Sequence, residues 1–452
     1  GVGGAGGDVG YGSFDYAFGN TTGAGGNGTG GIATAELAGV SGATDTLIAT
    51  NTIVVDSSAT GGDGGTHFFL GGGFDTPLAA RGRIGLLAAG GASSGGSATG
   101  GTATLTVSGN GVTIGGANNI DGVTFFYGGA SVSGNAVAGN GGTGTAGSIG
   151  GSGGVATGGS ATFAVVDADL AIRQVDVTAN ATAGSGNYSY DGAGGDGGNA
   201  TGGSATILAQ GVATDLTIGN FTLTTDATGG SGGGQSRGAA STSVGVGGSG
   251  QGGTSEVRAE LARLSFDNSG FGGAGPGTLY TISANGTGGR GGNNDGSFFN
   301  PGGAGGNGGA GTGGTARIAA NGGTVLGFDF QLAANGYGGE GGFGINAALD
   351  GNGGAGTGGT GQIRVQDIGN NFGLIQLGAV TMNANGVGGE SAANGVFGPS
   401  TGGFISLRDE KDALAEAENL AKKDAAQLPL FGVPVAVKDN IDAQGLATTA
   451  AC

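Results

Sequence analysis

Short runs of alternating apolar and polar residues recur along residues 1–408, and glycine-rich tracts separate them. Period-2 alternation is typical of a half-buried strand. Each run follows a Gly-Gly pair and a Ser or Thr, and these pairs recur about every 44 residues, with insertions. The runs are "ATLTV" after Thr102, "ATFAVV" after Ser160, "ATILAQ" after Ser204, "SEVRAEL" after Thr254, "ARIAA" after Thr315 and "GQIRV" after Thr360, and a last Gly-Gly pair at 402–403 precedes "FISLR".

A second strand-like run follows each first one, for example "LTIGNFTLTTDA" over residues 216–227, and a glycine-rich tract comes after it. We therefore expect an all-β fold, a glycine-rich parallel β-solenoid (β-helix) repeat array over residues 1–408. In such a fold glycine supplies sharp turns and close contacts between coils stacked about 4.8 Å apart. The alternative is that the Gly-Gly-X tracts form extended polyproline-II-like segments packed side by side, since that helix has three residues per turn.

Composition and charge exclude several classes of function. With 121 glycines but only 6 prolines the chain is not collagen-like, and a net charge of -18 argues against a nucleic-acid partner. The single cysteine, Cys452, excludes an intramolecular disulfide framework, and the single histidine, His67, leaves little for a zinc site or a Ser-His-Asp triad. No apolar run reaches the roughly 18–20 residues of a transmembrane helix. We expect no cofactor, no metal and no transmembrane segment.

Glycine-rich motifs and turn aspartates carry little further information. A Gly-x-Gly-x-x-Gly pattern arises by chance at this glycine content, and the Gly-Lys pair of a phosphate-binding loop is absent. Asp63, Asp196 and Asp295 lie in glycine-rich turns, but they lack the tandem spacing of calcium-binding repeats. We interpret them as solvated turn residues, and His67 as a surface or turn residue.

The repeat style "TGGSAT…LTI…ANGTGG" resembles the passenger regions of bacterial autotransporters and filamentous-haemagglutinin-like exoproteins over about residues 30–408. That resemblance implies a right-handed β-helix at the cell surface. The leading interpretation is a non-catalytic structural or adhesive repeat protein, secreted or held on the outer cell surface. Unpaired edge strands at the ends of the array predict end-to-end self-association into filaments.

The composition changes at about Arg408, which predicts a domain boundary between residues 1–408 and 409–452. All four lysines lie beyond it, at Lys411, Lys422, Lys423 and Lys438. Residues 412–426, "DALAEAENLAKKDAA", have helical composition and an i, i+4 Glu-Lys pair. A loop and an alternating valine strand that ends at Lys438 follow. We expect residues 409–452 to be a short α/β fragment with the order helix–loop–strand.

This segment resembles the first part of the core of the amidase signature family, and its sequence is most similar to the allophanate hydrolase type. The resemblance rests on "PLFGVP" at 429–434, "VKDN" at 437–440, Gly445 and 448–449, although Leu428 and Ala447 depart from the family pattern. It implies a Ser–cis-Ser–Lys triad in which Lys438 matches the lysine base, while the two serines follow further downstream. We therefore expect no activity from the chain as written.

Two alternatives to the structural-repeat interpretation stay open. The first is a fragment of an amide-hydrolysing enzyme of the allophanate hydrolase type, whose catalytic residue here is Lys438. The second is a polyglycine-sandwich binding module.

Overall fold

A computed structural model describes part of the chain. The described residues are 1–4, 9–10, 23–39, 47–49, 52–65, 67–68, 92–109, 112–114, 116–120, 123–144, 149–189, 192–235, 243–267, 279–294, 303–344 and 350–392. They belong to one compact unit that runs from Gly1 to Thr401. Regular structure within the described residues is β-strand throughout.

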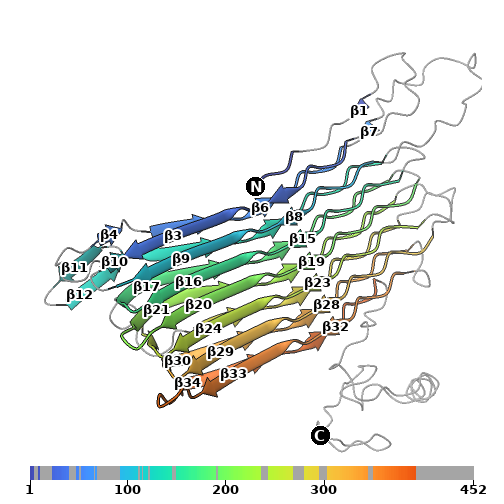
Figure 1. Cartoon of the computed structure of the whole chain (residues 1–452). Coiled ribbons are helices and arrows are strands. Elements are labelled where there is room, and N and C mark those ends of the chain that lie inside the picture. The colour runs from blue at the N-terminus through green and yellow to red at the C-terminus, as the bar shows by residue number, and fades with distance from the viewer. Residues whose placement is uncertain are drawn as a thin grey trace, which may run out of the picture. The chain divides into compact units, whose positions relative to one another are not determined.

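The repeat unit is a coil, which we define as one circuit through two stacked layers. A representative coil passes through β19 (Ala200–Thr201), β20 (Ser204–Gln210), β21 (Asp215–Thr224) and β22 (Ala227–Thr228). Equivalent strands of successive coils pair in parallel, and Figure 1 shows them side by side along the stack. The first two strands of a coil lie in layer 1 and the last two in layer 2.

Layer 1 contains a long and a short sheet, each with seven strands. Long sheet 1 comprises β3 (Ile32–Ala38), β9 (Thr102–Ser108), β16 (Ser160–Val166), β20, β24 (Thr254–Glu260), β29 (Thr315–Asn321) and β33 (Thr360–Gln366). Short sheet 1 comprises β2 (Gly28–Thr29), β8 (Ala98–Thr99), β15 (Ala156–Thr157), β19, β23 (Gly250–Gln251), β28 (Gly311–Thr312) and β32 (Gly356–Thr357).

Layer 2 contains an eight-stranded long sheet and a seven-stranded short sheet. Long sheet 2 comprises β5 (Thr52–Asp56), β13 (Gly129–Ser133), β17 (Asp169–Thr178), β21, β25 (Arg263–Phe266), β26 (Leu279–Ser283), β30 (Thr324–Ala333) and β34 (Leu374–Asn383). Short sheet 2 comprises β6 (Ala59–Thr60), β14 (Ala136–Val137), β18 (Ala181–Thr182), β22, β27 (Gly286–Thr287), β31 (Gly336–Tyr337) and β35 (Gly386–Val387).

Three two-stranded pairs complete the described strands. Two of them are parallel and one is antiparallel. They are β1 (Val9–Gly10) with β7 (His67–Phe68), β4 (Leu47–Ala49) with β10 (Val112–Ile114), and β11 (Gly116–Ile120) with β12 (Val123–Tyr127).

The main core lies between the two long sheets. In β20 the burial alternates, so that Ala205, Ile207 and Ala209 point inward and are fully buried. Ile207 pairs in register with Phe163 of β16 and Val257 of β24, which makes a continuous apolar column through the stack. Burying each such large side chain contributes roughly 1.5–3 kcal/mol.

Four aromatic rings fill the core where long sheet 2 is divided between β25 and β26. Phe221, Phe266, Tyr280 and Phe330 lie with ring centroids 5.0 to 6.2 Å apart. The Tyr280 hydroxyl donates to the carbonyl of Gly219 at 3.1 Å, so the buried polar end of the ring has a partner.

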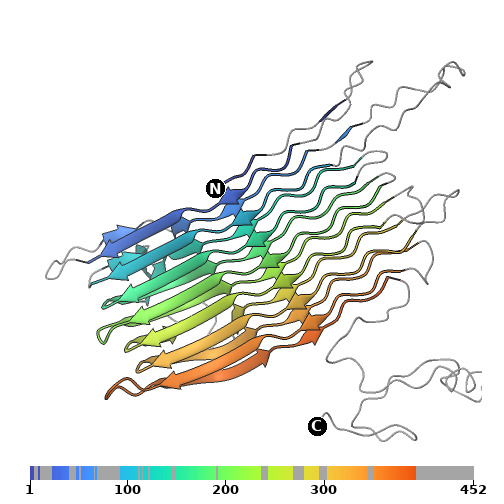
Figure 2. The ribbon, with the colours of Figure 1, turned by 45° about the vertical axis from the view of Figure 1, so that its right-hand side comes forward.

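The two layers approach each other as the side chains between them become smaller. Between the short sheets the buried residues are alanines, such as Ala156, Ala181, Ala200 and Ala227. Beyond them both layers continue as glycine tracts, which Figure 2 shows as extended segments lying side by side. A Cβ built on Gly197 would lie 1.9 Å from the carbonyl oxygen of Gly230 in the opposite layer, so the close approach of the layers requires glycine.

Hydrogen bonds in the glycine tracts repeat every three residues. Gly229 donates its N–H to Thr287 O of the same layer in the next coil, at 2.8 Å. Gly230 donates to Gly198 O of the opposite layer, at 2.9 Å. The third N–H of each triplet faces outward, and the same order of partners then recurs. This threefold pattern, in segments that are not strands, is that of polyproline-II-type helices bonded to their neighbours.

The predicted fold class is therefore wrong. A β-solenoid uses its glycines as sharp turns, but here the tracts are extended and bond both along and between the layers. The described region is a set of stacked parallel sheets of seven or eight strands in two layers, and its glycine tracts match the polyproline-II-like alternative. The expected helix–loop–strand of residues 409–452 lies outside the described residues.

The corner directly after the strand of long sheet 1 takes a left-handed backbone in five coils. Gly109, Gly211 and Gly322 take φ values of 71°, 104° and 59° directly after strands of long sheet 1. The equivalent corners of two other coils place Asp167 and Leu261 at φ values of 46° and 57°. For leucine this conformation costs roughly 1–2 kcal/mol.

Candidate functional site

The catalytic residue suggested by sequence, Lys438, lies outside the described residues, as does the whole of residues 409–452. The polar groupings that the structure does place are in the repeat region, on the outer surface of its layers.

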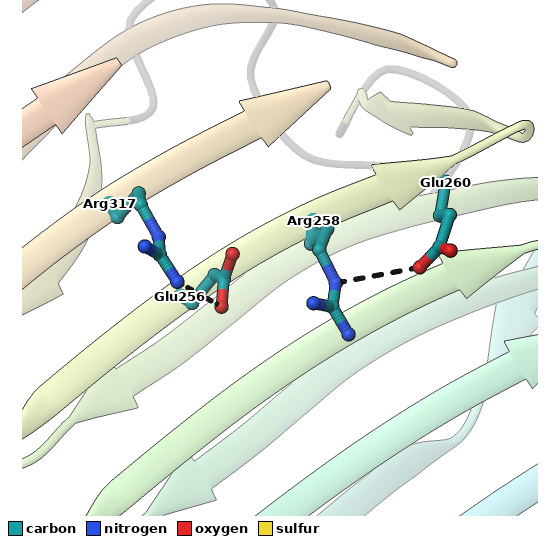
Figure 3. A network of polar contacts seen from close by, with 4 residues as sticks. All are labelled: Glu256, Arg258, Glu260 and Arg317. Carbon is teal, nitrogen blue, oxygen red and sulfur yellow. Dashed lines mark hydrogen bonds and ion pairs between the residues drawn. The ribbon is translucent and has the colours of Figure 1, made fainter. Parts of the chain in front are cut away.

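The most prominent polar grouping lies on the outer face of long sheet 1, and Figure 3 shows its four residues. Glu256, Arg258 and Glu260 alternate along β24 and therefore point to the same face. Arg317 of β29 lies directly opposite Glu256 in the register of the two strands. The cluster carries two carboxylates and two guanidinium groups, so its formal charge is balanced.

The two ion pairs of this cluster differ in geometry and burial. Arg317 Nη2 donates to Glu256 Oε2 at 2.7 Å, and the two side chains are 28% and 10% exposed. Arg258 Nε lies 3.9 Å from Glu260 Oε2, and both side chains are about one-third exposed. The first is a cross-strand pair that joins two coils, whereas the second lies within one strand. Neither arrangement brings together a nucleophile and a base, so we interpret the cluster as structural.

A ladder of Asn, Asp and Ser side chains runs along the outer surface of layer 2. The side-chain oxygen of each rung but the last accepts the outward-facing backbone N–H of the equivalent residue in the next coil. The rungs are Ser58, Asn135, Asn180, Asp226, Asn285, Asn335 and Asn385, with donor–acceptor distances of 2.6 to 3.1 Å. Sequence analysis missed this ladder, although the recurrence of Asn or Asp before the short strands of layer 2 from β14 onward was a signal for it.

Asp56 lies beside the first rung of the ladder. Its Oδ1 accepts the Ser58 N–H at 2.9 Å and the Ser133 hydroxyl at 2.7 Å. Burial works to raise the pKa of Asp56, but the hydrogen bonds from Ser58 and Ser133 outweigh it and hold the pKa below its ordinary value.

The turn aspartates have the same structural role as the ladder residues. Asp63 Oδ1 accepts the N–H of Asn140 at 2.7 Å, and Asp196 Oδ1 accepts the N–H of Val246 at 2.9 Å. The interpretation of these two as solvated turn residues is therefore incomplete, because each bonds the next coil. Asp295 lies outside the described residues.

The remaining sequence expectations concern a lone histidine, metals and membranes. His67 belongs to the two-residue strand β7, so it is not in a turn. In the part of the chain that the structure describes, no three potential metal ligands of the His, Cys, Asp or Glu type gather together. The described residues also include no helix with the length and apolarity needed to cross a membrane.

Comparison with known proteins concerns only the C-terminal segment. The Amidase family profile matches residues 401–452. The urea amidolyase of Saccharomyces cerevisiae is 47% identical over 55 residues, and that of Lachancea kluyveri is 49% identical over 55 residues. In both cases the match covers 12% of this chain and 3% of the relative. No solved structure matches the chain.

These matches overturn the leading interpretation. The expectation of a non-catalytic structural or adhesive repeat protein is wrong, because the similar proteins are an amidase family and enzymes named urea amidolyases. The expected secretion and outer-cell-surface location are wrong as well, because they rested on the resemblance to autotransporter passengers, whereas the matches are to the amidase family and to urea amidolyases. The segment that the comparisons identify is residues 401–452, and it is similar to the amidase family.

Proposed function

We propose that the protein acts in the hydrolysis of amide bonds, through an amidase domain that begins in residues 401–452. The observation that carries the proposal is the family match over those residues, which include Lys438. The two relatives are named for urea amidolysis, and this supports a small urea-type amide as the substrate class.

In this proposal Lys438 is the general base of a Ser–cis-Ser–Lys triad. A neutral lysine takes the proton of the bridging serine, and that serine in turn activates the nucleophilic serine toward the amide carbonyl. The resemblance puts both serines in a segment that follows Cys452. The repeat region has no assigned step in this chemistry.

The test is ammonia release from urea-type amides by a chain that continues through both serines. Removing a general base lowers the rate by about 10²–10⁴-fold, and this is the loss expected for Lys438→Ala. Lys423→Ala is the matched control, because it removes a lysine that lies outside the motif. A Lys438→Ala variant with undiminished activity would show that the triad is wrongly assigned. Absence of activity in the same longer chain without any substitution would refute the function itself.

Self-association through the ends of the repeat region stays a prediction. The strands β3 and β33 end long sheet 1 within the described residues, and they carry exposed Ile32 and Val365. Such edges pair readily with another strand. Light scattering over a range of protein concentrations checks the prediction, and a constant monomer mass would contradict it. The expectation that nucleic acid is not a partner also stays a prediction.

A further inference from the structure

Two columns of hydroxyl side chains run along the outer face of layer 1, one in short sheet 1 and one at the start of long sheet 1. A column here is the set of residues that pair in register from coil to coil. The first is Thr29, Thr99, Thr157, Thr201, Gln251, Thr312 and Thr357. The second is Ile32, Thr102, Ser160, Ser204, Thr254, Thr315 and Thr360.

The side chains of both columns point away from the protein interior. Thr157 and Thr201 are exposed, whereas the alanines that precede them, Ala156 and Ala200, are buried. In the second column Ser204 is exposed and is followed by buried Ala205. Strand pairing fixes the spacing from coil to coil at about 4.7–4.9 Å, so the hydroxyls form a regular two-dimensional array.

These hydroxyl groups differ from the side chains of the ladder on layer 2 in their hydrogen bonding. None of the Ser and Thr side chains of the two columns makes a hydrogen bond to another residue that the structure describes. The ladder on layer 2 is the opposite case, because its side chains bond the next coil, as Asn180 does with Asp226. The array on layer 1 is therefore available to water or to a ligand, and the same stacked coils hold it in place.

We propose that the strip of the outer face of layer 1 formed by these two columns binds ice. A surface that repeats by translation is complementary to a partner that also repeats by translation. β-Branched threonine presents a methyl and a hydroxyl group in a restricted set of rotamers, so bound water is held at fixed intervals. The partner is thus crystalline water, and the inference is independent of the proposed amidase function.

The side chains of the two columns favour ice over a polysaccharide or a protein. They include no aromatic residue on which a sugar ring would stack and no charged residue. The charged cluster of β24 and β29 lies further along the same face, from Glu256 and Arg317 onward. Short sheet 2, on the other layer, is less regular, because Val137, Tyr337 and Val387 interrupt its threonine column. Threonine is a good strand former on either layer, so strand propensity alone does not explain the difference.

The test uses the full chain labelled at its single cysteine, Cys452, and slow growth of ice in the solution. We expect the labelled protein to be incorporated into the ice. Thr157→Lys with Thr201→Lys breaks the array on layer 1 and should leave the protein in the liquid. Thr182→Lys with Thr228→Lys makes the same change in charge on the exposed residues of layer 2 and should leave incorporation unchanged.

Circular dichroism at the working temperature confirms that each variant is folded. If the lysine variant of layer 1 is unfolded, Thr157→Val with Thr201→Val replaces it, because that pair removes the hydroxyls and keeps the β-branched shape. Exclusion of the unmodified protein from ice would overturn the proposal. Equal behaviour of the two variant pairs would do the same, and so would retention on crystalline cellulose without incorporation into ice.

Discussion

Asn180 Oδ1 accepts the backbone N–H of Asp226 at 2.7 Å, from a position one coil earlier in the stack. Asp226 then accepts the N–H of Asn285 through its own carboxylate, at 2.6 Å. The outward-facing N–H at this position has no strand partner, so the side chain of the preceding coil satisfies it. The ladder therefore couples neighbouring coils at a point where the sheet hydrogen bonds are interrupted.

Replacing a rung should weaken the junction between two coils. Asn180→Leu removes the acceptor for the Asp226 N–H and the donor to Thr224 Oγ1, and we expect a loss of about 1–3 kcal/mol in the free energy of unfolding. Asn180→Asp keeps the acceptor and should lose less. Denaturant unfolding followed by circular dichroism compares them, and equal stability of the two variants would argue against the ladder as a source of stability.

The alternation of apolar and polar residues in the sequence was enough to predict the strands. The run "ATILAQ" after Ser204 falls within β20 with the expected burial, and the period of the Gly-Gly pairs matches the coil-to-coil pairing. The conformation of the glycine tracts was mispredicted, because glycine is compatible both with turns and with extended segments. What decides between them is the carbonyl of a residue far away in sequence, such as Gly198 O beneath the Gly230 N–H.

For the candidate site, the sequence predicted the family of the C-terminal segment but not the function of the chain or its polar contacts. The motif around Lys438 was sufficient to indicate the amidase family, which the profile match over residues 401–452 supports. The function of the whole chain was mispredicted, because the interpretation gave more weight to the long repeat than to the short motif. The pairing of Glu256 with Arg317 was not predictable, since it depends on a register between strands 61 residues apart in sequence.

The glycines that face the opposite layer should not tolerate a side chain. A Cβ at Gly230 would lie 1.8 Å from Gly184 O, in the preceding coil of the same layer, and 3.0 Å from Gly198 N of the opposite layer. Both contacts are with backbone atoms, so the neighbouring coils must move apart. We expect Gly230→Ala to destabilise the repeat region by about 3 kcal/mol or more. Ser231→Ala is the control at the adjacent outward-facing position, and its effect should be small. Thermal unfolding measures both, and similar midpoints for the two variants would contradict the packing of the layers.

The two ion pairs on the outer face of long sheet 1 should contribute unequally. The Glu256–Arg317 pair is short and the carboxylate is nearly buried, so its coupling energy should be about 1.5–3 kcal/mol. The Arg258–Glu260 pair is longer and more exposed, and its coupling should be about 0–1 kcal/mol. Double-mutant cycles with Gln in place of each charged residue measure both values. If the two pairs had the same coupling energy, at low salt and again at high salt, burial would not distinguish them.

The stability of the aromatic core should depend on pH in the alkaline range. Burial, followed by the nearby charge of Asp267, raises the pKa of Tyr280 to about 12, from the ordinary value of 10.0. The folded state thus holds the phenol proton more tightly than the unfolded state does. The stability due to this proton is complete below pH 10 and is lost as the pH rises from about 10 through about 12.

Tyr280→Phe removes the titrating group, although it also removes the hydrogen bond to Gly219 O. The variant should therefore be less stable at neutral pH but lose less stability between pH 10 and 12. Unfolding curves across that range, with the phenolate absorbance followed in parallel, provide the measurement. An equal alkaline loss in both proteins would mean that Tyr280 is not the group responsible.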